Sequence, residues 1–482
     1  MKRYFVFLFC LIVVIMLGAG CKKFLDVNPS TNAQVSPRSA KDFEQILNNS
    51  ALATPNYLVA DLMGDDIMLG DALATLDPSA YNTKAYNWDA TVWGAADVDF
   101  MYDNSYRMIL QMNIVVDNID KADSGTVQRK NIIRAQAKIN RAYYYFQLVN
   151  LYGNGYQAAT AGTDLGVPLV LHAGASMETK RTTVQTVYDQ ILLDLQDAVN
   201  NTDLPDFGVD VIHPGRAAAL AMQARAYLYM GNYEKALAAA TLALNIKSTL
   251  LDYNKFSFVS SYYPSYGINN KPFTLKDQVN NPEVLFARVC TEIAFKNKYS
   301  TSPWISDDLA ALFGPSDLRF IFNFPPNDYG QDVSRLKYFL YNNRSTMMFD
   351  YNIGVPEMML IKAECLARQA NADVAGALTL LNQLRKYRFT PAKYVPLTGT
   401  DATAVLKLVL DERRRELFQH GGIRIFDLKR LNTDSRFKVD LTRVSDVSGK
   451  VIATLPAGSP RYLVPFAPMI IANNPSIIQN NR

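Results

Sequence analysis

One stretch limits the possible folds of this chain more than any other. It is GRAAALAMQARAYLYMGNYEKALAAATLALNI, residues 215–246, and it predicts two helices that meet at Met230-Gly231-Asn232. Small side chains stand where the two helices must touch, with Tyr227 packed between them, at Ala224, Ala236, Ala240 and Ala243. Because small side chains let one helix pack closely against another, we expect a helical hairpin.

Those spacings resemble a tetratricopeptide hairpin, the repeating unit of one class of helical scaffold. A second stretch of this kind, MMLIKAECLARQANADVAGALTLLNQLRKYR, occupies residues 358–388. More than a hundred residues separate the two, which predicts an interrupted array rather than a regular solenoid. Helical periodicity recurs in other parts of the chain, over residues 106–120, 134–155, 182–199 and 404–422. The predicted fold class is mainly α, with a tetratricopeptide-like scaffold of helical hairpins.

Residues 249–350, between the two hairpins, lose the helical periodicity. They are rich in Tyr, Phe, Pro and Asn, as in SSYYPSYGINNKPF and TSPWISDDLAALFGPSDLRF. Long irregular segments inside compact proteins usually carry function. We therefore expect this loop-rich, irregular insertion to be functional.

The first residues predict export and a lipid anchor. Lys2 and Arg3 precede an uncharged apolar run, Tyr4 to Leu17, which is too short to span a membrane comfortably. Residues 1–20 are therefore interpreted as a signal peptide, and the Cys21 thiol can carry a diacylglycerol. Two or more acyl chains give stable anchoring, and residues 21–39 form the acylated terminus and tether. The alternative is an ordinary secreted protein in which Cys21 follows the signal by chance.

Composition argues against several functions. The formal net charge is +4, or +2 without Lys2 and Arg3, and no basic block exists, which argues against nucleic acid as a partner. Only Cys290 and Cys365 remain in the body of the chain, so at most one disulfide can form there. No second apolar stretch is long enough to span a membrane.

The acidic pairs and histidines give little support for chemistry. Asp65-Asp66 and Asp307-Asp308 could be catalytic or bind calcium, but paired acids are also common at helix starts. No EF-hand loop is present. The histidines have no metal-ligand spacing and no nucleophile motif beside them; they are His172, His213 and His420. We therefore name no catalytic residue, no metal ligand and no cofactor, and expect the protein not to be an enzyme.

The segment ERRRE, residues 412–416, combines arginines with glutamates at helical spacing. Asp411 and Glu412 precede Arg415 by four and three residues, which suits ion pairs on one helix face. Arg–carboxylate pairs also suit half-buried packing. We interpret the segment as a structural ion-pair network, shared with Arg424, Asp427 and Arg430, rather than as a catalytic or phosphate-binding site.

Several aromatic residues lie outside the predicted helices. An aromatic ring can stack on the apolar face of a sugar while polar side chains bond its hydroxyls. The candidate ligand-binding residues are Trp88, Trp93, Tyr263, Tyr266 and Trp304. The alternative is that these rings pack in the core or within loops.

Five segments in order resemble the SusD/RagB family of surface lipoproteins from the Bacteroidetes. They are CKKFLDVNP at 21–29, RAYYYFQLVNLYG with GVPLVL at 141–171, RTTVQTVYDQILLDL at 181–195, DERRRELFQHGGIRIFDLKR at 411–430 and NNPSIIQN at 473–480. His420 stands where the family usually has glutamate.

The resemblance implies a single SusD-like domain over residues 40–482. A helical scaffold would cover about 40–248 and 351–435, the insertion at about 249–350 would form the ligand face, and an extended tail would cover about 436–482. It also implies a lipid-anchored protein of the outer membrane, facing the cell exterior. Such a protein would hold a glycan above a SusC-like TonB-dependent transporter.

Three alternatives remain open at the level of sequence. A relative of the same family could capture peptides instead of glycans. A tetratricopeptide-type scaffold could bind other proteins and no small ligand. A glycoside hydrolase would need two carboxylates at a set separation, which a sequence does not give.

Overall fold

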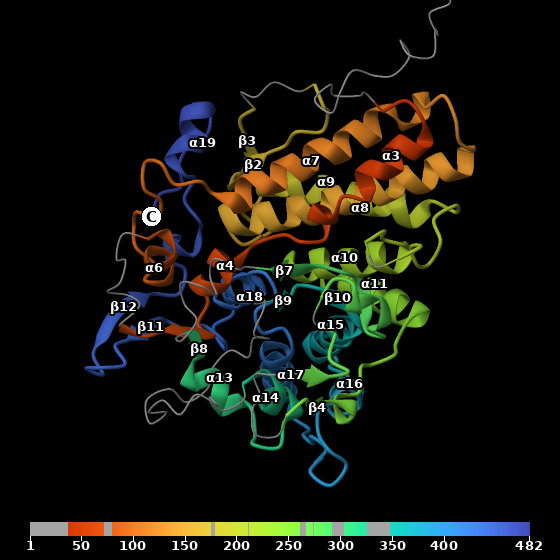
Figure 1. The fold of residues 1–482 in the computed structure, drawn as a ribbon. Helices are drawn as coiled ribbons and strands as arrows, with labels where there is room; N and C mark the ends of the chain where they lie inside the picture. The colour runs from red at the N-terminus through yellow and green to blue at the C-terminus, as the bar shows by residue number, and fades with distance from the viewer. Residues whose placement is uncertain are drawn as a thin grey trace, which may run out of the picture.

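Most of the chain folds into two layers of helices, and short two-stranded sheets are distributed around and between them (Figure 1). The computed structural model describes residues 37–71, 80–174, 179–210, 212–260, 267–272, 274–291, 303–324 and 348–482. Among the helices of these segments, none is both long and apolar enough to cross a bilayer.

The upper layer in Figure 1 contains four helices, α3 (Ala40–Leu47), α7 (Phe100–Asn118), α8 (Val127–Tyr152) and α9 (Val184–Asn200). Each begins after an N-cap side chain that accepts a backbone N–H, respectively Ser39, Asp99, Thr126 and Thr183. Helix α8 contacts both α7 and α9. Its second half is buried on all sides because aromatic side chains fill the space around it, among them Tyr143, Tyr144, Tyr145 and Phe146.

The second layer confirms both predicted hairpins. They are α10 (Arg216–Tyr229) with α11 (Tyr233–Ile246), and α15 (Val355–Arg368) with α16 (Val374–Arg385). Gly231 turns the chain between α10 and α11 at a φ of +70°. The predicted small contacts are all buried, at Ala224, Ala236, Ala240 and Ala243. Because α11 also packs against α15, the two hairpins adjoin although the insertion separates them in sequence.

The insertion is less irregular than predicted. Its described part contains the short helices α13 (Asp307–Leu312) and α14 (Leu318–Asn323). It also contains strands that form antiparallel pairs: β4 (Ser257–Phe258) with β5 (Ile268–Asn269), β6 (Val284–Phe286) with β10 (Ile353–Gly354), β7 (Val289–Thr291) with β9 (Met348–Asp350), and β8 (Pro303–Ile305) with β1 (Ile67–Leu69). Strands of two or three residues are too short to show a periodic pattern. Two small apolar clusters, one around Phe256 and one around Phe313, pack within it apart from the main core.

Helices α17 (Ala402–Glu416) and α18 (Ile423–Leu431) lead into the C-terminal tail. The tail is not simply extended, since it forms β11 (Leu441–Val444), β12 (Val451–Leu455) and α19 (Pro468–Asn473). It packs on the N-terminal part of the chain, near α4 (Leu58–Met63) and α6 (Tyr81–Tyr86), as Figure 1 shows at the left. Arg443 donates to the carbonyls of Leu62, Gly64 and Tyr86.

The two cysteines of the body, Cys290 and Cys365, are both buried and form no disulfide. The one disulfide that the cysteine count allowed between these two residues therefore does not form.

Candidate ligand-binding pocket

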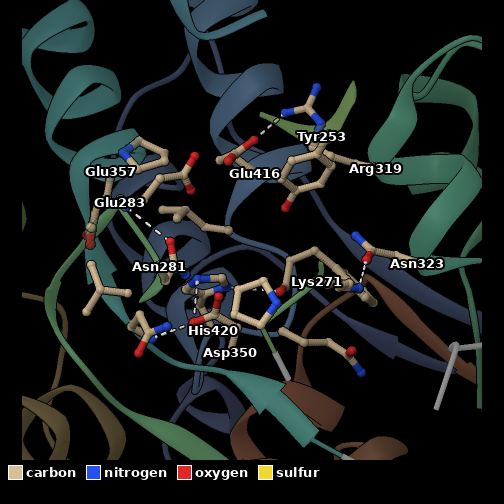
Figure 2. Close-up of a pocket in the computed structure, with 18 of the residues that line it drawn as sticks. Tyr253, Lys271, Asn281, Glu283, Arg319, Asn323, Asp350, Glu357, Glu416 and His420 are labelled. Atoms are coloured by element: carbon tan, nitrogen blue, oxygen red, sulfur yellow. Dashed lines mark hydrogen bonds and ion pairs between the residues drawn. The ribbon is translucent and has the colours of Figure 1, made fainter. Parts of the chain in front are cut away.

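A polar pocket of about 150 Å³ lies where the insertion meets the link between α17 and α18 (Figure 2). Three parts of the chain line it. The insertion supplies most of the side chains, the residues around the start of α15 supply others, and the end of α17 with the link supplies the segment from Arg415 to His420.

Three amide side chains bond one another beneath the pocket. The Nδ2 groups of Asn281 and Asn352 both donate to Oε1 of Gln278, each at 2.9 Å. Their own carbonyl oxygens accept backbone N–H groups, from Glu283 at 3.1 Å and from Arg288 at 2.7 Å. Because all three amides are engaged and buried, this floor is rigid.

One wall is a buried network of charges. Arg319 donates to Asp317 and Glu416, while Arg388 donates to Glu416 and Glu283. Burial penalises the charge of Glu416, but the two guanidinium groups outweigh it and lower its pKa. Burial raises the pKa of Glu283, against the attraction of Arg388. These pairs hold the wall in place, because each buried charge faces an opposite one.

The other side of the pocket carries Lys271, Asn323, Asp350 and His420, which lie close together in Figure 2. The Lys271 ammonium donates to Oδ1 of Asn323. Burial lowers the pKa of Lys271 to about 8, and the Asp350 carboxylate opposes that shift. Asp350 itself accepts the backbone N–H of Asn352 at 2.8 Å. This side therefore presents both donors and a carboxylate acceptor.

The α17–α18 link adopts an unusual backbone. Gln419, Gly421 and Gly422 have φ values of 53°, 67° and 86°, in the left-handed region. Asp61 of α4 stabilises this shape by accepting the Gly422 N–H at 2.7 Å and the Tyr351 hydroxyl at 2.8 Å. Burial raises the pKa of Asp61 to about 7. The link places Gln419 Nε2 in a buried position with no hydrogen-bond partner among the described residues.

The arrangement suits a small polar ring. A cavity of roughly 150 Å³ holds a six-membered ring, and the lining combines the rings of Tyr253, Phe324 and Phe418 with amides and charges. Ring faces can stack on the C–H face of a sugar, while the amides and carboxylates bond hydroxyls.

Two of the predicted ligand residues lie elsewhere. Trp88 is 0% exposed and its Nε1 donates to the Met63 carbonyl at 2.8 Å. Trp93 is 4% exposed and its Nε1 donates to the Pro465 carbonyl at 2.7 Å. Both indoles are packed in the core with their polar atoms satisfied, so the prediction that they form a ligand platform is wrong for these two residues.

The other predicted site residues are only partly visible. The backbone of Trp304 lies in β8, opposite Met68 of β1, and its side chain lies outside the described part of the structure. Tyr263, Tyr266 and Cys21 also lie outside the described residues. Their predicted roles remain predictions.

Sequence reasoning missed the pocket residues themselves. The asparagine-rich composition of the insertion was a signal for polar ligand contacts, but it does not single out Asn281 or Asn323. Lys271 and Gln419 stand in no motif, and only the fold brings them to one pocket.

The arginine-rich segment is structural, as predicted. Glu412 pairs with Arg415, while Arg413 and Arg430 both pair with Asp427 at 2.8 Å. Asp411 is an exception, because it binds Lys407 and not Arg415. The Asp65-Asp66 pair, one of the candidate calcium or catalytic sites, is held in ion pairs by Arg414 of this segment and by Arg424.

Two family models match the chain. One, described as "Starch-binding associating with outer membrane", matches residues 23–228, and one described as "SusD family" matches residues 355–481. Together they cover about two thirds of the chain. The chain belongs to the SusD/RagB family. Neither SusD model covers residues 229–354, which contribute most of the pocket lining.

Solved structures of SusD-like proteins share this fold. A Bacteroides vulgatus protein is 20% identical, with a TM-score of 0.71, and the match covers 93% of this chain and 99% of that one. A SusD superfamily protein from Bacteroides thetaiotaomicron is 20% identical, with a TM-score of 0.69 and coverage of 92% and 100%. A SusD-like carbohydrate binding protein from Bacteroides vulgatus is 19% identical, with a TM-score of 0.65 and coverage of 91% and 97%. A search of curated proteins found no match.

Proposed function

We propose that this protein is a lipid-anchored surface protein that captures glycans and delivers them to a SusC-like TonB-dependent transporter in the outer membrane. The observation that carries the proposal is the ring-sized pocket lined by amides, charges and aromatic rings, in a chain of the SusD/RagB family. A structural neighbour described as carbohydrate binding supports it.

The proposed role does not need tight binding. A pocket for one ring desolvates few atoms, which limits the affinity to roughly the micromolar to millimolar range. Capture at the cell surface still raises the local concentration of glycan beside a transporter. Stacking by Tyr263, Tyr266 and Trp304 stays a separate part of the proposal, which binding of one ring in this pocket does not require.

The test is calorimetric titration of the soluble body, residues 22–482, with a panel of glycans and a panel of peptides. Binding to at least one glycan, without hydrolysis of it, is the expected result. Binding to peptides alone would transfer the protein to the peptide-capturing part of the family. Binding to neither panel, together with a stable complex with a barrel transporter, would leave only a scaffold role.

A further inference from the structure

We infer that the pocket accepts a single uncharged sugar ring at the end of a glycan chain, and that Lys271, Asp350 and Gln419 recognise its hydroxyl groups. The inference rests on the proposed glycan-binding function and specifies which part of a glycan is recognised.

The size and the closed inner end of the pocket favour a chain end. A volume of about 150 Å³ accommodates about one ring. The inner end is closed by the amide floor around Asn281 and by the charge network around Glu416, both rigidly bonded (Figure 2). A sugar from the middle of a chain has a neighbour on both sides, whereas a terminal sugar has one neighbour and suits a ring-sized pocket with a closed floor.

The balance of charges favours a neutral ligand. Arg319 and Arg388 in the wall are both bound to carboxylates, and Arg415 is bound to Glu412. On the other side of the pocket, Lys271 and Asp350 lie close together in Figure 2, and the carboxylate favours the charged ammonium. Each cation of the described lining is therefore already neutralised by a carboxylate, and none is left to pair with an acidic sugar. Desolvating a ligand carboxylate here would cost free energy without a matching ion pair.

The donors and the acceptor on this side of the pocket match adjacent hydroxyls. A sugar hydroxyl both donates and accepts, so Asp350 can accept from one hydroxyl while Lys271 donates to its neighbour. Bonds to charged groups are roughly twice as strong as neutral ones. Gln419 Nε2, buried and without a protein partner among the described residues, adds a donor to the lining. The left-handed backbone at Gln419 fixes its position.

The first experiment uses maltose, maltotriose, maltohexaose and the cyclic glucan α-cyclodextrin as probes, because one matching family model is described as starch-binding. The same linear and cyclic comparison is applied to any other glycan found to bind in the panel. We expect similar Kd values per chain for the linear members and at least about tenfold weaker binding of the cyclic one, which has no end. An affinity that rises steadily with chain length, or equal binding of the ring, would overturn the inference.

The second experiment tests the residues on the glycan that binds. Lys271→Met, Asp350→Asn and Gln419→Ala should each weaken binding about tenfold or more. Lys255→Met, at an exposed lysine of the same insertion, should leave it unchanged. A glucuronate-ended version of the same chain should bind more weakly than the neutral one, and equal or tighter binding would refute the neutral-ring assignment.

The two proposals fail in different ways. If no glycan binds the unaltered protein, the glycan-capture function fails and this inference fails with it. If a glycan binds but the three variants bind it as well as the unaltered protein, glycan capture stands and only this pocket is refuted as its site. Circular dichroism and thermal unfolding of each variant show that a loss of binding is not a loss of folding.

Discussion

Trp88 illustrates how burial decides the role of a single aromatic residue. Its indole is stacked 4.2 Å from the Arg443 guanidinium carbon and its backbone has a φ of 55°. We expect Trp88→Ala to lower the free energy of unfolding by about 3–5 kcal/mol, because it leaves a large cavity in the core. Chemical denaturation measures this, with Val447→Ala as an exposed control. A stable Trp88→Ala protein that has lost glycan binding would contradict the core assignment.

Asp61 should make stability depend on pH. Burial raises its pKa from 3.8 to about 7, so the folded state retains a proton that the unfolded state releases above about pH 4. The contribution of this group to the free energy of unfolding is complete below that pH and is lost as the pH rises through 7. Asp61→Asn should therefore show a smaller fall in Tm than the unaltered protein between about pH 5 and pH 8. An unchanged profile, matching that of the exposed control Asp123→Asn, would refute this.

Ion pairs between neighbouring residues of one helix can be predicted from the sequence, whereas ion pairs between distant residues cannot. The pair of Glu412 with Arg415 was predictable because residues three apart on a helix are neighbours. The wrong pairing of Asp411 arose because Lys407 competes from the preceding turn. The bond from Arg319 to Glu416 joins residues 97 apart in the chain, and no local pattern reports such a contact.

At the scale of elements, the α10–α11 hairpin was predictable because its small side chains repeat at helical spacing. Ala236 is fully buried at this contact. Ala236→Leu should overpack it and cost about 1–3 kcal/mol of stability. Ala238→Leu is the matched control, since Ala238 is exposed on the same helix. Thermal unfolding of both variants gives the comparison, and equal Tm values would mean that the helices do not meet at Ala236.

The α17–α18 link was not predictable, because its shape depends on Asp61 and Tyr351 from distant parts of the chain. A Cβ on Gly422 would lie 2.9 Å from the Ala60 Cβ at a φ of +86°. Gly231, with a φ of +70° and open space around it, has only the backbone cost. Gly422→Ala should therefore destabilise the protein more than Gly231→Ala, which should cost about 1–2 kcal/mol. Equal losses in chemical denaturation would show that the link tolerates the added methyl group.

Contacts between distant parts of the chain explain why further features of the fold were not predicted from the sequence. The tail was predicted as an extended segment, and its β11–β12 hairpin was missed although the two strands are close in sequence. Its contact with α6 was missed because it joins residues far apart in the chain. Arg443 binds backbone carbonyls, which every residue has, so no sequence pattern identifies its partners. The pocket of the insertion also needs residues from the α17–α18 link, which are distant in the sequence.

The attachment of the whole protein to the membrane depends, in our proposal, on one atom, the Cys21 sulfur. The body carries a net charge of only +2 once Lys2 and Arg3 are removed, so electrostatic attraction to anionic lipid is weak. Two or more acyl chains would hold it stably. We expect Cys21→Ala to move the protein from the outer-membrane fraction to the soluble fraction with an unchanged Tm. Cell fractionation and surface labelling check this, with Cys365→Ser, a buried thiol of the body, as the control. Membrane association of Cys21→Ala that persists in cells without the transporter would refute the lipid anchor, because weak electrostatics alone cannot account for it.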